Sequence, residues 1–295
     1  MSHGIIKGVQ FLVRGDFDRV WSGAHARVYR LAWRVLYYLI SPLRRSGRRA
    51  VAGRLGVETK HPVAYESPDH KIPYGTARDN STNGKFVLYM DELLHREFGD
   101  QTLRVMDLGC SGGQMVIDFL KLRWMAFGIE GSDYSLKHRR ANWKHYANRN
   151  LFTADITKPL HATINDQPAT FHLITAWEVL EHIASVDLDA LFENIRRHLE
   201  PGGYFIASTT STPDVQNGIE LHQTQWENSR WQDYVTRRFP DLQQVEVGLK
   251  TYQFVRCNFD APSFLTYRKA KAASTSAPSA VATGQSEHIL SSAET

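Results

Sequence analysis

The stretch "RVMDLGCSGGQM", residues 104–115, joins a short apolar run to a loop with three glycines, and a helical pattern follows. A strand, a glycine loop and a helix in this order bring a ligand to the helix N-terminus at the carboxyl end of a parallel sheet. The dinucleotide fingerprint would need a glycine at Ser111. Asp107, two positions before the first glycine, would face a pyrophosphate unfavourably. The stretch therefore favours a ligand that is cationic at this end.

The apolar run in this stretch is the first of seven along the chain, and helical patterns separate the first five. This alternation predicts a doubly wound, Rossmann-like α/β fold with a mostly parallel sheet of seven strands. A hairpin-like loop separates the last two runs, which predicts an antiparallel edge strand. The runs are "TLRVMDL", "WMAFGIE", "NLFTAD", "FHLITAW", "GGYFIAST", "QQVEVGL" and "FLTYRKA".

Four regions follow from this pattern. The sheet-forming domain covers residues 98–270, and a leader region over residues 61–97 contains a predicted helix that ends at Gly99. Residues 271–295 are rich in Ala, Ser and Thr, which predicts a disordered tail. Residues 1–60 hold 12 Lys and Arg against 3 Asp and Glu, so they form a basic arm on a mildly acidic body.

The arm contains one predicted basic amphipathic helix, residues 16–40, which "SPL" stops and "RRSGRR" follows. Three interpretations stay open. The helix packs on its own domain or on a second subunit, or residues 16–49 lie in a membrane surface and meet lipid phosphates, or the arm binds nucleic acid. Nucleic acid is the least favoured because the arm lacks a recognition motif. The oligomeric state stays open as well.

Composition excludes several classes of protein. With 295 residues, 42% of them hydrophobic, the chain can bury a core. It has no uncharged apolar window of about 18 residues and no secretory signal, so we expect a cytoplasmic protein, with peripheral membrane contact if the arm binds lipid. Cys110 and Cys257 lie outside any Cys-x-x-Cys spacing, which argues against a disulfide framework and a structural zinc site.

S-adenosylmethionine is a ligand of the required charge, since it has an ammonium group, a sulfonium and no phosphate. Glycines would let the backbone approach its methionine portion, and Asp107 would complement its positive charge. At the end of the second apolar run, Glu130 can accept both ribose hydroxyls. At the end of the third, Asp155 can accept from the adenine amino group while the Ile156 N–H donates to the ring.

These acids and glycines resemble those of the class I S-adenosylmethionine-dependent methyltransferases. "DLGCSGG" is similar to their first motif, "GIEGS" to their second, and "TAWEVLEHI" with "LEPGGYFIAST" to their fourth and fifth regions, over about residues 75–270. The E-V-L-E-H wording resembles the branch that includes ubiquinone-pathway O-methyltransferases, although Glu130 stands where aspartate is commoner. The resemblance implies a methyltransferase whose cofactor-binding residues are Asp107, Gly109, Cys110, Ser111, Gly112, Glu130, Asp155, Ile156 and Trp177.

The fourth region supplies the candidates for catalysis. At an expected helix start, Glu178, Glu181 and His182 stand at i, i+3 and i+4 and can share a face. We take His182 as the general base, with Glu178 or Glu181 orienting it. Two alternatives remain: structural support of the helix start without chemistry, or a divalent metal site completed by His222, as in small-RNA 2′-O-methyltransferases with a similar Glu-x-x-Glu-His pattern. No metal is our preferred expectation.

The acceptor is expected to be an oxygen, because methyltransferases of exocyclic base amines typically carry an Asn/Asp-Pro-Pro-aromatic stretch where this chain has "AWEV". Residues 208–234 mix aromatic and amide side chains that suit sugars or ring substrates. We therefore expect O-methylation of a small molecule, a glycan or a lipid-linked acceptor. The alternatives are a metal-assisted RNA 2′-O-methyltransferase and a non-catalytic S-adenosylmethionine-binding protein.

Overall fold

The computed structural model describes residues 53–81, 83–248 and 263–271 of the chain. The predicted arm helix over residues 16–40 and residues 272–295 of the predicted tail lie outside the described residues. Among the described helices, none is long and apolar enough to cross a bilayer.

A seven-stranded sheet forms the centre of the fold, with the strand order β11-β12-β8-β7-β2-β3-β4. Strands β4, β3, β2, β7 and β8 are parallel, and β12 is antiparallel to both of its neighbours, β8 and the edge strand β11. The predicted α/β fold is confirmed. Its strands are β2 (Arg104–Leu108), β3 (Met125–Glu130), β4 (Leu151–Thr153), β7 (Phe171–Trp177), β8 (Leu199–Thr209), β11 (Leu242–Gln244) and β12 (Ser263–Lys269).

The strand order reverses at β2, which has β3 on one side and β7 on the other. The chain runs outward from β2 through β3 to β4 and then returns to β7. In open α/β sheets, ligands bind outside the carboxyl ends of the strands at such a switch point. The glycine loop directly follows β2, so the topology places it at this point.

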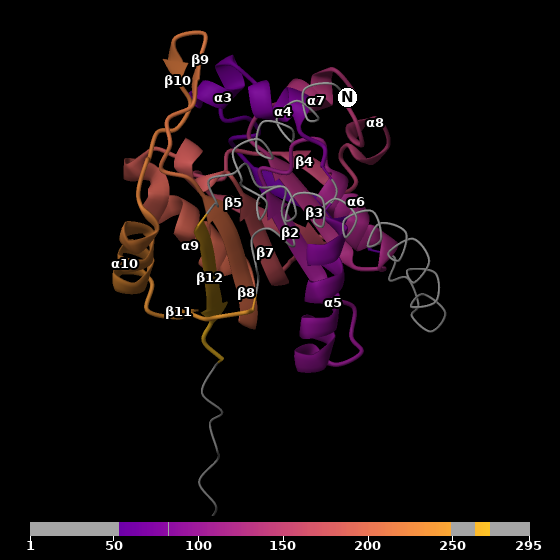
Figure 1. The fold of residues 1–295 in the computed structure, drawn as a ribbon. Helices are drawn as coiled ribbons and strands as arrows, with labels where there is room; N and C mark the ends of the chain where they lie inside the picture. Colours follow the sequence, from indigo (N-terminus) through magenta and orange to yellow (C-terminus); the bar gives the residue numbers. More distant parts are fainter. Residues whose placement is uncertain (1–52, 82, 249–262, 272–295) are drawn as a thin grey trace, which may run out of the picture.

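Helices cover both faces of the sheet (Figure 1). α5 (Gly84–Phe98) and α6 (Gln114–Lys121) pack on one face, and α9 (Leu188–His198) and α10 (Asn228–Arg238) on the other. Alternate strand residues serve the two faces: Val105 packs with α5 and α6, whereas Met106 packs with α9 and α10. α5 ends at Gly99, as predicted, and Gly99 has a φ of 73°.

A second sheet of three antiparallel strands lies beside the first, in the order β1-β5-β6. Its strands are β1 (Leu55–Thr59), β5 (Leu160–Ile164) and β6 (Gln167–Pro168). Residues 55–59 fall within the range that the sequence assigns to the arm, yet they pair along their whole length with β5. This part of residues 1–60 is therefore built into the fold.

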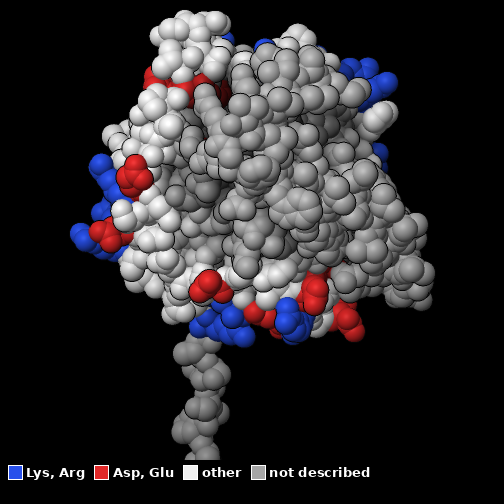
Figure 2. Space-filling model, viewed as in Figure 1, with Lys and Arg blue, Asp and Glu red and all other residues white. Residues whose placement is uncertain are grey.

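Short elements gather at one end of the molecule (Figure 1). They are α3 (Pro68–Lys71), α4 (Tyr74–Arg78), α7 (Tyr134–Lys137), α8 (Trp143–Tyr146) and the hairpin of β9 (Val215–Gln216) and β10 (Ile219–Glu220). On the face shown in Figure 2, described basic and acidic side chains lie next to one another along the margins. Many surface charges are paired, such as Arg237 with Asp233 at 3.1 Å.

Candidate cofactor and acceptor site

The glycine loop leaves β2 and turns into α6 through three residues in the left-handed region. Gly109, Ser111 and Gly113 have φ values of 67°, 45° and 80°. The N–H groups of Gly109 and Cys110 donate to the Ile129 carbonyl at 2.8 and 3.1 Å, which holds the loop against the end of β3. A Cβ atom on Gly109 would lie 2.4 Å from Val179 Cγ2. Glycine is therefore required at the start of the loop both for its conformation and for the close approach of the β7 loop.

Two buried acids flank this loop at the ends of adjacent strands. Asp107 is 4% exposed and accepts from the Thr175 hydroxyl at 2.8 Å. Glu130 is 7% exposed, and burial raises its pKa although the N–H groups of Ser111 and Ser132 donate to it at 2.8 and 3.3 Å. Two carboxylates in a largely dry site favour a partner that is cationic or rich in donors.

Burial raises the pKa of Asp107 to about 8; the Thr175 hydrogen bond opposes this, and the charges of Glu130 and Asp79 add to it. The free protein therefore holds a proton on Asp107 at pH 7, and the stability this contributes is lost as the pH rises from about 4 through 8. An ammonium group beside the carboxylate favours its ionised form. We expect S-adenosylmethionine binding to release a proton, and its Kd to fall by up to about tenfold between pH 6 and 7.

Calorimetry in two buffers of different ionisation enthalpy measures this proton release directly. Asp107→Asn, which cannot titrate, should show no dependence of the binding heat on the buffer. A wild-type binding heat that is the same in both buffers would contradict the prediction.

The remaining cofactor candidates lie at the same edge of the sheet. Asp155 follows β4, and its Oδ1 accepts from the N–H and hydroxyl of Thr157 at 2.9 and 2.6 Å. Ile156 is buried beside it. Trp177 ends β7, donates to Met115 Sδ at 3.2 Å and packs edge-on against Phe86. β2, β3, β4 and β7 are parallel neighbours, so the ends of these strands line one edge.

Cys110 is a buried residue of the loop. A Cβ atom on Gly128 would lie 2.7 Å from its Sγ, and burial raises the pKa of the thiol well above its usual range. A buried thiol with a raised pKa is unreactive. Its position agrees with a small residue that lines the loop.

On the acceptor side, the expected helix start at residues 178–182 is wrong. Leu180–His182 form a single 3₁₀ turn, and Glu178 has a φ of 51°. The Glu178 N–H donates to the Ser208 hydroxyl at 3.0 Å, and this hydroxyl donates to the Glu178 carboxylate at 2.6 Å. Glu178 is thus turned toward the end of β8 and does not share a face with His182.

Glu181, His182 and His222 come together instead, with ligand atoms that all lie within 4.8 Å of one another. We call them the Glu181–His182–His222 cluster. The rings of the two histidines meet edge to face at a centroid distance of 4.7 Å. Thr224 holds the His222 segment in place, because its N–H donates to the Glu181 carbonyl at 2.9 Å and its hydroxyl to the Ile183 carbonyl at 2.7 Å.

Glu181 and His222 differ in how their side chains are satisfied. Glu181 is fully buried, and neither carboxylate oxygen has a well-oriented hydrogen-bond partner among the described residues. Burial, with the charge of Glu178, raises the pKa of Glu181 to about 8, and the N–H groups of Glu181 and Thr210 offset this only partly. His222 directs Nδ1 at the Thr212 carbonyl.

His182 faces a residue that the sequence did not indicate. Its Nδ1 lies 2.9 Å from Asp69 Oδ2, on α3 of the leader. Burial opposes protonation, but the Asp69 carboxylate, followed by Glu181 and Asp214, outweighs it and raises the pKa of His182. The carboxylate that faces the Nδ1 atom of His182 is therefore Asp69 and neither of the acids in the "EVLEH" stretch. No motif in the leader could have indicated this contact.

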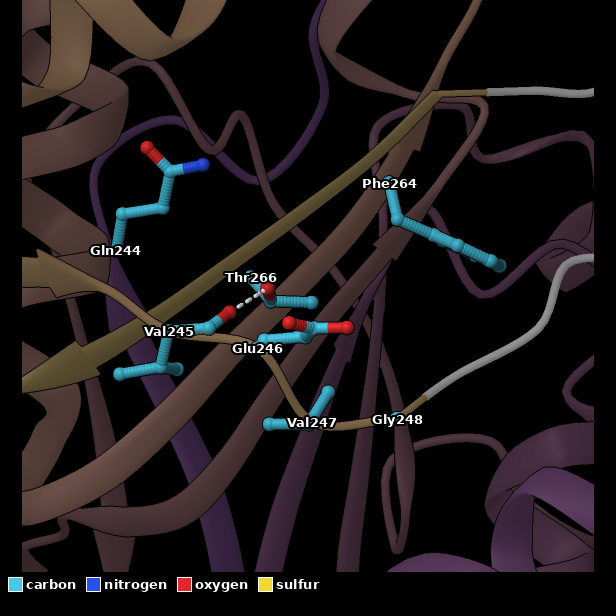
Figure 3. A pocket seen from close by; sticks show the side chains of 7 residues that line it. All are labelled: Gln244, Val245, Glu246, Val247, Gly248, Phe264 and Thr266. Carbon is cyan, nitrogen blue, oxygen red and sulfur yellow. Dashed lines mark hydrogen bonds between the residues drawn. The ribbon is translucent and has the colours of Figure 1, made fainter.

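A separate hollow of about 530 Å³ lies over β11 and β12 (Figure 3). Its lining comprises Gln244, Val245, Glu246, Val247, Gly248, Phe264 and Thr266. None of these is a predicted cofactor or catalytic residue. Phe264 connects the hollow with the candidate site through an edge-on contact with Trp177 at a centroid distance of 5.9 Å.

Comparison with known protein families identifies the class of this protein. A family model described as a methyltransferase domain matches residues 84–254, more than half of the chain. The chain belongs to this methyltransferase family. The prediction of a class I S-adenosylmethionine-dependent methyltransferase, with S-adenosylmethionine as its cofactor, is thereby confirmed.

Two relatives are ubiquinone biosynthesis O-methyltransferases. That of Chelativorans sp. (strain BNC1) is 28% identical over 107 residues, which are 36% of this chain and 40% of the relative. That of Mesorhizobium japonicum is 25% identical over 144 residues, which are 49% of this chain and 55% of the relative. The chain thus spans about half the length of these relatives.

Solved structures of methyltransferases are also similar to this chain. Magnesium protoporphyrin IX methyltransferase from Synechocystis PCC 6803 with bound SAH has a TM-score of 0.45 and 12% identity, and the match covers 70% of this chain and 97% of that one. CalS10, an amino pentose methyltransferase from Micromonospora echinaspora with bound SAM, has a TM-score of 0.45 and 12% identity, with 68% and 96% covered.

Proposed function

We propose that this chain transfers the methyl group of S-adenosylmethionine to a hydroxyl oxygen of a small-molecule, glycan or lipid-linked acceptor. The observation that carries the proposal is the Glu181–His182–His222 cluster. Glu181 and His182 follow β7, in the same loop as Val179, which approaches Gly109 of the glycine loop, and His222 follows β10. An oxygen acceptor must lose a proton as the methyl group arrives, and the cluster supplies groups that can take it. The names of the two ubiquinone-pathway relatives support oxygen over nitrogen.

On the cofactor side, Asp107 faces the ammonium group, Glu130 accepts from the ribose hydroxyls, and Asp155 with Ile156 holds the adenine ring. Gly109, Cys110, Ser111 and Gly112 give the backbone close access to the methionine portion, and Trp177 forms a wall. These proposed roles are supported by the positions of the side chains, which lie at or just after the ends of the neighbouring strands β2, β3, β4 and β7. They hold the sulfonium in place for an in-line displacement.

On the acceptor side, His182 accepts the hydroxyl proton as the oxygen attacks the methyl carbon. The carbon–sulfur bond breaks and S-adenosylhomocysteine leaves. Glu178, bonded to Ser208 at the end of β8, keeps the strand-end loop in the conformation that presents His182. Catalysis then depends chiefly on positioning, since the leaving group is already activated as a sulfonium.

A second candidate is metal-assisted transfer, which includes RNA 2′-hydroxyl groups as acceptors. The observation in its favour is that neither Glu181 carboxylate oxygen has a well-oriented hydrogen-bond partner within the described part of the chain, while both histidines direct Nδ1 at an acceptor, Asp69 or Thr212. Histidines that bind a metal through one nitrogen usually have such an acceptor on the other. Three ligands of this kind leave a position open for a substrate oxygen.

Methyl transfer from radiolabelled S-adenosylmethionine to a panel of acceptors tests both candidates. The panel contains catechols, sugars, amines and a short RNA, each with and without EDTA. Transfer to hydroxyl compounds alone supports the first proposal, and transfer to RNA that EDTA abolishes supports the second. Cofactor binding without transfer to any acceptor supports a non-catalytic binding protein.

We further propose that the basic arm brings the protein to a membrane surface where a lipid-linked acceptor lies. Its charge supports this, and a variant that lacks residues 1–52 keeps the residues of β1, Leu55–Thr59. Co-sedimentation with anionic vesicles should disappear after this deletion. A change of mass in solution, with vesicle binding unaltered, would instead support a subunit interface.

A further inference from the structure

Within the leader region, residues 67–80 contact both the cofactor side and the acceptor side of the site, and we call them the leader segment. Asp69 on α3 contacts His182 on the acceptor side. Thr76 on α4 donates its hydroxyl to Glu130 Oε1 at 3.3 Å on the cofactor side. Only residues 72 and 73 separate the two helices, so the attachments of α3 and α4 lie close together along the chain.

Hydrogen bonds, rather than buried apolar side chains, hold the leader segment against the rest of the fold. Thr76 is the only buried residue in it. Carbonyls of α4 and of its C-cap residue accept hydrogen bonds from side chains that follow β3 and β2 in the chain: Thr76 O from Ser135 of α7 at 3.2 Å, and Asp79 O from Ser111 of the glycine loop at 2.8 Å. Arg140 donates to the carbonyls of Ala77 and Asp79, both at 2.6 Å. A segment with so little buried apolar surface opens at low cost.

Ser111 of the glycine loop takes part in these hydrogen bonds to the leader segment. It adopts a left-handed conformation that glycine would adopt without strain, and its hydroxyl lies within reach of the carbonyls of Gly75, Thr76 and Asp79. One residue of the glycine loop, Ser111, therefore binds the leader segment through its side chain. The leader segment packs against the loops of the cofactor side, and its side chains contact both the cofactor side and the acceptor side of the site.

The contact between Thr76 and Glu130 competes with the cofactor. Glu130 has three described hydrogen-bond donors, of which the N–H groups of Ser111 and Ser132 belong to the main chain. The third, the Thr76 hydroxyl, has the same chemistry as a ribose hydroxyl. If Glu130 holds the ribose, as proposed above, the two hydroxyls compete for Oε1.

We propose that Asp69 is a positioning residue for His182, and that the leader segment carrying it is displaced at Thr76 when the cofactor ribose takes its place on Glu130. The leader segment then links the binding of the cofactor to the orientation of the His182 ring. This inference rests on the proposed roles of Glu130 and His182. Linkage is reciprocal, so releasing either attachment of the leader must favour cofactor binding.

The first test is calorimetry of S-adenosylhomocysteine binding to the full chain. Thr76→Val removes the competing hydroxyl and should lower the Kd about fivefold, equivalent to about 1 kcal/mol. Asp69→Asn loosens the other attachment and should lower the Kd about threefold. Damage to the fold would raise the Kd instead, so the sign separates the two explanations. Thr170→Val is the matched control, because Thr170 donates to Glu200, outside the proposed site.

The second test observes His182 itself by NMR of protein labelled with ¹⁵N-histidine. S-adenosylhomocysteine should shift the His182 ring resonances in the wild type. Ligand-free Thr76→Val should already show part of that shift, whereas Thr170→Val should not. Ser135→Ala, which releases the Thr76 carbonyl, replaces Thr76→Val if the latter does not fold.

The outcomes separate this inference from the proposed function. No binding of S-adenosylhomocysteine by the wild type would overturn the assigned cofactor roles. Binding with equal Kd in the wild type, Thr76→Val and Asp69→Asn would overturn the inference alone. Weaker binding by a folded Thr76→Val would make Thr76 a cofactor ligand and would also overturn it.

Discussion

Glu130→Ala should weaken S-adenosylmethionine binding by about tenfold or more, equivalent to about 1.4 kcal/mol. Glu130 ends β3 beside the glycine loop and is 7% exposed, so it offers both oxygens in a site from which water is largely excluded. Hydrogen bonds to a charged group contribute about 1.5–3 kcal/mol each. The variant also leaves the Ser111 and Ser132 N–H groups without their acceptor.

Calorimetry of wild type and variant measures the change, with S-adenosylmethionine and S-adenosylhomocysteine in parallel. Glu58→Ala is the control, since Glu58 is an exposed acid of β1. An unchanged Kd in Glu130→Ala would mean that the ribose binds elsewhere. The opposite signs expected for Glu130→Ala and Thr76→Val make the pair especially informative, because the two residues share one hydrogen bond.

His222→Ala should weaken the binding of Co²⁺ by about 100-fold or more if the cluster is a metal site, since even residues that only orient a metal ligand contribute about 10–100-fold. His222 is 9% exposed and contributes one of three groups within 4.8 Å. The fully buried Glu181 carboxylate lacks a well-oriented hydrogen-bond partner among residues 53–81, 83–248 and 263–271, so a cation would satisfy it. The visible absorption of bound Co²⁺ reports the affinity.

His161→Ala is the matched control for this measurement, because His161 is an exposed histidine of β5. Tight Co²⁺ binding that both variants retain would place the metal elsewhere. No Co²⁺ binding by the wild type would reject the metal-assisted candidate and leave His182 as the base. Both results can be obtained before an acceptor is known.

The sequence alone determined the framework of this protein. Alternating apolar runs and helical patterns specify strands and helices locally, and the short connections allow few ways to assemble them into a sheet. The acids Asp107, Glu130 and Asp155 end or follow three successive apolar runs, and parallel strands bring such ends to one edge. For this reason the loop after β2 and its acids could be located without a structure.

Only the tertiary structure showed which acid lies against His182. Spacing along the chain predicted a helical face shared by Glu178, Glu181 and His182, but the left-handed conformation of Glu178 redirects the chain there. The contacts of His182 with Asp69 and of Thr76 with Glu130 join residues 113 and 54 positions apart. Such contacts have no local pattern, because they depend on where the sheet places two distant loops. The sequence determines what chemistry the edge of the sheet can offer, and the packing of the leader against it determines how that chemistry is assembled.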